Sequence, residues 1–132
     1  MRSEIKADFV LVDATLDPDR VTSLLGIQPT EIWRAGELRG KSPLLRHVNN
    51  GWVLSSGLPV TSGLEEHTKA LLDQIEPAWD AAVALGDQFY AEFAYAVYSY
   101  GGDRPAIHFD SETVRRAAEL HAAFDVDLFV LP

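Results

Sequence analysis

The feature that most constrains the fold is the run from Phe89 to Tyr100, FYAEFAYAVYSY. Side chains alternate between the two faces of a β-strand. One face of this run would carry Phe89, Ala91, Phe93, Tyr95 and Val97. The other would carry Tyr90, Glu92, Ala94, Ala96, Tyr98 and Tyr100. Because both faces are largely apolar and rich in aromatic residues, the run predicts a central strand.

A short helix is predicted over residues 18–25. Asp17 can cap its free N–H groups, and Pro18 suits the first helical position because proline has no N–H there. Gly26 stands where a left-handed residue ends a helix, and Pro29 prevents any continuation.

A longer helical stripe is predicted from residue 62 to about residue 85. Ser62 and Glu65 form a capping box at its start. Pro77 removes one backbone donor and clashes with the preceding turn, so we expect a kink near Glu76. Gly86 would end the second segment.

The remaining pattern completes an α+β domain that spans residues 1–132. Gly101-Gly102-Asp103 predicts a turn into a partner strand at 106–109, and Asp110 or Ser111 caps a helix through about Phe124. The expected order is β-α-β-β-α-β-β-α-β, with strands at 5–15, 30–34, 52–56, 89–100, 106–109 and 126–131. This order predicts a ferredoxin-like general plan, with an antiparallel-dominated or mixed sheet and helices on one face.

Several short motifs occur in a characteristic order along the chain. They are Leu-Asp-Pro (16–18), Leu-Gly-Ile-x-Pro-Thr (25–30), Gly36, Trp-x-Leu-x-Ser (52–56) and Leu-Glu-Glu-His (64–67). In this the chain resembles the uncharacterised bacterial domain family DUF 4279. The resemblance implies a compact α+β domain and carries over no catalytic residues.

Composition restricts the setting and the partners of this domain. The 132 residues carry a net charge of −9 and include no cysteine, which excludes disulfides, thiolate metal sites and cysteine nucleophiles. The N-terminal sequence lacks the apolar segment of a signal peptide, and no apolar run approaches a membrane span. We therefore expect a cytoplasmic protein that does not bind membranes.

Positive charge is concentrated in one segment of this acidic chain. Residues 34–60 carry four cations against one carboxylate, a net charge of +3. The predicted ligand-binding residues are Trp33, Arg34, Arg39, Lys41, Arg46 and Trp52. Arginine grips carboxylate or phosphate, and indoles supply stacking faces, so we expect an anionic small molecule or a protein segment here. The alternative is that both tryptophans are core residues and the arginines are solvated.

Nucleic acid is not expected as a partner, because phosphate contacts need a broad basic face. The acidic surface suggests a second hypothesis, an immunity-type inhibitor that blocks a basic toxin. A row formed by Tyr90, Tyr98 and Tyr100 would be either a homodimer face or a core covered by helices.

No catalytic signature, cofactor motif or metal-ligand spacing is recognised, so we predict no catalytic residues, cofactor or metal. A third hypothesis is a small hydrolase or isomerase that uses Glu92, His108 and Asp110. We interpret His121 as a core histidine on the stripe of Val114, Ala117 and Ala118, and His67 as a residue of the first helical turn.

Overall fold

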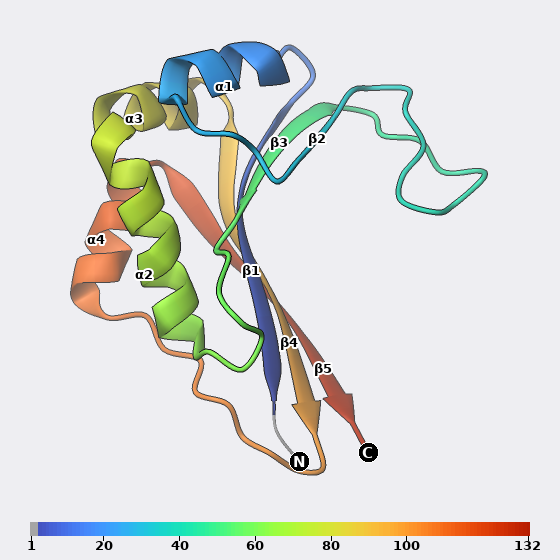
Figure 1. Cartoon of the computed structure of the whole chain (residues 1–132), viewed down its shortest axis with the longest axis vertical. Helices are drawn as coiled ribbons and strands as arrows, with labels where there is room; N and C mark the ends of the chain where they lie inside the picture. The colour runs from blue at the N-terminus through green and yellow to red at the C-terminus, as the bar shows by residue number, and fades with distance from the viewer. Residues whose placement is uncertain (1–2) are drawn as a thin grey trace.

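The computed structural model describes residues 3–132 as one five-stranded sheet with helices packed on one of its faces (Figure 1). The strands are β1 (Glu4–Asp13), β2 (Glu31–Trp33), β3 (Asn50–Ser55), β4 (Tyr90–Tyr100) and β5 (Ala122–Leu131). The helices are α1 (Pro18–Leu25), α2 (Leu64–Ile75), the 3₁₀ turn η1 (Glu76–Ala78), α3 (Trp79–Gln88) and α4 (Ser111–Glu119). The predicted α+β class is confirmed.

The sheet is mixed, as predicted, with strand order β2-β3-β1-β4-β5. β1 is central and pairs antiparallel with both β3 and β4, and β2 pairs antiparallel with β3. β4 and β5 are parallel, which requires a crossover, and α4 supplies it. β4 therefore has a neighbour on each side, in agreement with the prediction of a central strand.

The predicted strand at 106–109 is wrong, because residues 103–110 form no helix or strand. Phe109 instead packs its ring between two strand aromatics, 4.1 Å from Phe124 and 5.6 Å from Tyr95 between ring centroids. The segment therefore crosses the helix-covered side of the sheet. The position beside β4 that a hairpin partner would occupy belongs to β5.

Helix α1 forms as predicted. The Asp17 carboxylate accepts a hydrogen bond from the Asp19 N–H at 3.1 Å, and Pro18 occupies the first turn. Gly26 ends the helix with φ 67°, a left-handed conformation that glycine adopts without steric cost.

Pro77 divides the long helical stripe as predicted, because α2 ends at Ile75 and α3 starts at Trp79. Two boundaries differ from the prediction. The capping residue is Gly63, whose N–H donates to the Glu66 carboxylate at 2.9 Å, and Ser62 and Glu65 do not form the box. α3 continues through Gly86, where the lack of a side chain lets the helix backbone lie close to the Leu120 carbonyl.

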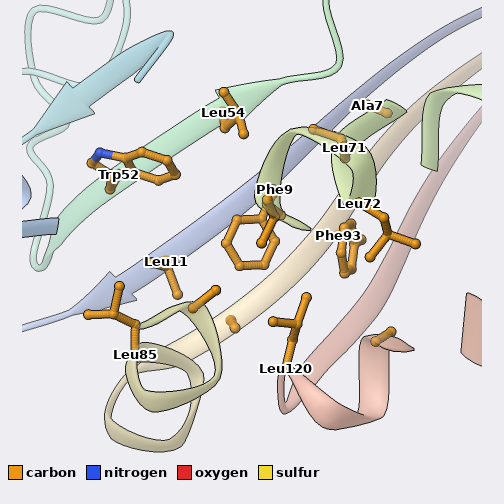
Figure 2. Close-up of a cluster of buried hydrophobic side chains, with 14 of the residues drawn as sticks. Ala7, Phe9, Leu11, Trp52, Leu54, Leu71, Leu72, Leu85, Phe93 and Leu120 are labelled. Carbon is orange, nitrogen blue, oxygen red and sulfur yellow. The ribbon is translucent and has the colours of Figure 1, made fainter. Parts of the chain in front are cut away.

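The hydrophobic core lies between the sheet and the helices (Figure 2). Alternate residues of β1 and β4 point into it, among them Phe9 and Phe93, whose ring centroids are 5.2 Å apart. Leu71 and Leu72 reach it from α2, and Leu120 reaches it from the end of α4. Each fully buried side chain of this size contributes about 1.5–3 kcal/mol through loss of contact with water.

The inward face of α4 differs from the predicted stripe. Thr113, Ala117 and Leu120 are buried, whereas Val114 and Ala118 are exposed. His121 is exposed as well, so the prediction of a core histidine is wrong. Its backbone has φ 56°, which turns the chain from α4 into β5 and directs the imidazole toward Asp87, 3.8 Å from Nε2 to Oδ1.

Candidate functional site

Residues 34–49, which we call the arm, connect β2 to β3 and project away from the helices (Figure 1). The arm is a hydrogen-bonded antiparallel ladder. The Gly36 N–H donates to His47 O at 2.9 Å, and the His47 N–H donates to Glu37 O at 2.8 Å. Leu38 and Arg46 form a bridge, and the Arg39 N–H donates to Leu45 O at 2.8 Å. The segment predicted as a loop is therefore an ordered extension of the β2–β3 hairpin.

The arm exposes apolar side chains to solvent. Leu44 is 86% exposed and Val48 is 84% exposed. Leu45 and Leu38 are exposed too. Single apolar residues on a surface are common, but four on one projecting hairpin indicate an interaction surface.

The predicted cations of the arm have different roles. Arg34 ties the base of the arm to α1, because its Nη2 donates to the Asp19 carboxylate at 2.9 Å. Arg46 forms a hydrogen bond within the arm, in which its Nη1 donates to Gly36 O at 2.7 Å. Arg39 and Lys41 are exposed and form no ion pair with any residue in 3–132. These two cations are therefore available to a partner.

The structure separates the two tryptophans that were predicted to frame one site. Trp33 is half-buried at the base of the arm and stacks on His47, with ring centroids 4.5 Å apart and planes at 12°. Trp52 is 0% exposed, and its Nε1 donates to Thr22 Oγ1 at 3.0 Å inside the core. The prediction that Trp52 belongs to the binding site is therefore wrong, because the alternation of β3 directs its side chain toward the helices.

A hollow of about 190 Å³ lies between the arm and β1. It is lined by Val12, Trp33, Arg39, His47, Val48 and Asn49. Pockets for drug-sized ligands usually measure about 300–1,000 Å³. The hollow is therefore small for an enclosed small-molecule site, and the arm offers more surface to a protein.

The face of the sheet away from the helices, which we call the open face, is acidic. Strand alternation and register place six carboxylates and one lysine on it, a net charge of −5. They are Glu4, Lys6, Asp8, Glu31, Glu92, Asp125 and Asp127. Partial burial raises the pKa of the Asp8 carboxyl above its usual value, a hydrogen bond from Ser55 opposes this rise, and neighbouring Glu31 adds to it.

The tyrosine row lies on this open face. Tyr90 is exposed, and Tyr98 stacks on Phe129 of β5 with ring centroids 5.0 Å apart. Tyr100 is half-buried on the same side. Because no helix within residues 3–132 packs over this face, the alternative of a core covered by helices is wrong.

The comparisons with known proteins identify the family. The family described as "Domain of unknown function (DUF4279)" matches residues 3–131. The chain belongs to the DUF4279 family. No curated protein and no solved structure matches this DUF4279 domain significantly.

The DUF4279 domain contains a buried serine–histidine pair that no sequence motif indicated. The Ser56 hydroxyl and His67 Nδ1 are 2.6 Å apart, and His67 is only 1% exposed. His67 Nε2 has no hydrogen-bond partner within residues 3–132. Burial lowers the pKa of the His67 imidazole, which favours its neutral form. The pair ties the segment after β3 to α2, and its enclosure keeps it from reaching a substrate.

The three residues of the hydrolase hypothesis are not brought together. Glu92 lies on the open face and accepts a hydrogen bond from the Tyr90 hydroxyl at 2.8 Å. Asp110 caps α4 on the helix side and accepts from the Thr113 N–H at 2.8 Å. His108 lines a hollow of about 580 Å³ together with Ile5, a residue of the helix-covered face. Glu92 is thus separated from the other two by the sheet.

Metal-binding clusters and membrane-spanning helices are both absent from residues 3–132. No group of three or more His, Asp or Glu side chains there is arranged to hold a metal ion. No helix in that range is both long and apolar enough to cross a membrane.

Proposed function

We propose that this DUF4279 domain is a non-enzymatic protein-binding module whose arm docks on an acidic, partly apolar surface of a partner. The observation that carries the proposal is the composition of the arm's exposed surface. Leu44 and Val48 are almost fully exposed, and Arg39 and Lys41, which form no ion pair within residues 3–132, stand on the same hairpin.

The energetics favour a protein over a small anion. Burial of one Leu or Val side chain against a partner contributes about 1.5–3 kcal/mol. Exposed cations contribute less to affinity, but they speed the encounter with an acidic surface and orient it. The ladder of the arm holds these side chains in one arrangement, which reduces the conformational entropy that docking would cost.

The proposal places the domain in a bacterial cytoplasm. The absence of cysteine from the chain and the family resemblance support this setting. We also propose that the connectivity is ferredoxin-like. It is supported by a mixed sheet with helices on one face, although the 106–109 strand on which it partly relied is absent.

Differential capture tests the proposed function. The immobilised full chain is incubated with bacterial lysate and with a separately tagged copy of itself, and retained proteins are quantified. The variant Leu44→Ser/Val48→Ser should lose the retained proteins, whereas Leu24→Ser, an exposed leucine of α1, should keep them. Identical retention by the arm variant and the wild type would show that the arm is not the docking element.

A second candidate function is supported by the acidic open face, which suits inhibition of a basic toxin. Glu92→Lys/Asp125→Lys should then abolish neutralisation of a toxin encoded beside this chain. Full toxicity in the presence of the wild-type domain would remove this candidate. The hydrolase hypothesis is not supported, because Glu92 lies on the opposite face of the sheet from His108 and Asp110.

A further inference from the structure

We propose that the partner of the arm is a second copy of this chain, with the arm of each copy docked on the open face of the other. This inference rests on the proposed function of the arm and names its partner. It is carried by a match in charge, a match in apolar surface, and the direction in which the arm projects.

The two surfaces are opposite in charge. The arm carries Arg34, Arg39, Lys41 and Arg46 against Glu37, a net charge of +3. The open face carries a net charge of −5. Such opposite potentials steer association and select against partners of the wrong sign. Within residues 3–132 the cations of the arm form no ion pair with the open face. The ion pairs of the arm are made by Arg34 with carboxylates at the start of α1.

The open face has an apolar floor between its carboxylates. Val10 of β1 stands in the middle of the sheet opposite Glu92, and Ala94 and Ala96 follow along the same face of β4, opposite Asp8 and Lys6. The valine and the two alanines are half-buried although no described helix covers them. Short side chains on β4 leave room for larger ones to pack on the sheet. The leucines of the arm, Leu44 and Leu45, supply side chains of that kind.

The position of the arm makes an exchange between two copies geometrically consistent. Trp33, at the base of the arm, pairs with Gly51 and so lies on the open face. The arm leaves the sheet on the side away from the helices (Figure 1). Leu44 is 86% exposed, so the tip does not pack on the open face of its own chain. A two-fold axis would bring each arm to the other copy's face and close the assembly at two subunits.

The location of Asp8 supports the same arrangement. Its carboxyl is half-buried on the open face, where the charge of Glu31 raises its pKa and that of Lys6 lowers it. A carboxylate in such a place is stabilised by an additional positive group. Arg39 or Lys41 of a second copy would supply that group.

A charge swap tests the inference directly by sedimentation equilibrium of the full chain. The arm variant is Arg39→Glu/Lys41→Glu, and the face variant is Glu92→Lys/Asp125→Lys. At the substituted positions each variant alone would place like charges opposite each other at both contacts, so its self-association should weaken by about tenfold or more. In an equimolar mixture the charges at the substituted positions are opposite again where the altered arm meets the altered face, and the other contact keeps its wild-type charges. The mixture should therefore form a heterodimer about as tight as the wild-type dimer.

Two controls show whether weaker self-association comes from the swapped charges. Val130→Lys on the edge strand β5 should leave the dimer intact, and circular dichroism should show that all variants are folded. A wild-type chain that is monomeric up to its solubility limit overturns the inference, as does a dimer that both swaps leave unchanged. If the chain is monomeric but Leu44→Ser/Val48→Ser still loses the proteins captured from lysate, the proposed function stands and only the inference fails.

Discussion

The indole of Trp33 rests directly on the backbone of Gly51, its partner across the β2–β3 pair. A Cβ added at Gly51 would lie 2.1 Å from Cε2 of Trp33, far inside van der Waals contact. The indole also stacks on His47, near the end of the arm. One residue without a side chain thus allows the contact that fixes the base of the arm to the sheet.

We predict that Gly51→Ala displaces Trp33 and destabilises the domain by about 1–3 kcal/mol, the usual cost of overpacking. Urea unfolding monitored by circular dichroism measures this loss. In a Trp33→Ala background the same substitution should cost much less, because the clashing ring is gone. Equal costs in both backgrounds would show that the indole is not what excludes a side chain at position 51.

The hydrogen bond from Trp52 to Thr22 links the core to α1 and gives a second prediction. Thr22→Val leaves the buried indole N–H without an acceptor, which should cost about 1–3 kcal/mol of unfolding free energy. In a Trp52→Phe background the loss should be smaller, since no donor remains to be satisfied. Trp52→Phe should also leave partner capture unchanged, in contrast to the arm substitutions. If the folded Trp52→Phe variant lost capture of the partner, Trp52 would have to be counted as a binding residue.

Local signals in the sequence were sufficient for part of this structure. Asp17, Pro18 and Gly26 each act on the backbone within one turn, so the start and end of α1 could be predicted from neighbouring residues alone. The alternation of β4 was equally informative, because its period is set by the strand itself.

Non-local contacts account for the errors. The Gly-rich turn before Ala106 is compatible with a hairpin, but the packing of Phe109 against Tyr95 and Phe124 decides the path of the chain. Residue type could not show whether Trp52 or Trp33 faces the helices, because both stand on short strands. The Ser56–His67 pair joins a loop to a helix, and no sequence spacing identifies such a contact.

His67 predicts a specific pH dependence of stability. Its pKa is lower in the folded domain than the value of 6.5 for a free imidazole. The unfolded chain therefore binds more protons, so the stabilisation is complete above pH 6.5 and decreases as the pH falls toward the folded pKa. Between about pH 7 and pH 5.5, unfolding free energy should fall less steeply in His67→Gln than in the wild type. His108→Gln, at an exposed position, is the matched control. Identical slopes in the wild type and His67→Gln would contradict this role.

A fourth prediction concerns Gly86, where packing should reverse the stabilisation that alanine usually gives inside a helix. Glycine to alanine inside a helix normally stabilises by up to about 1 kcal/mol. Here the new Cβ would lie 1.9 Å from the Leu120 carbonyl oxygen, so α3 would have to move away from the end of α4. We expect Gly86→Ala to lower the unfolding free energy by about 3 kcal/mol. An increase in the thermal midpoint would show that α3 and Leu120 are not in close contact.

The most direct test of the central claim, that the arm tip of one copy docks on the open face of another, is to find what Leu44 contacts in solution. The chain contains no cysteine, so Leu44→Cys provides a unique attachment point for a photoactivated crosslinker. An equimolar mixture of isotope-labelled and unlabelled chains distinguishes contacts between copies from contacts within one copy. We predict crosslinks between copies to open-face residues of β1 and β4, such as Val10 and Ala94. Crosslinks confined to the same chain, or directed to the helix-covered side, would contradict it.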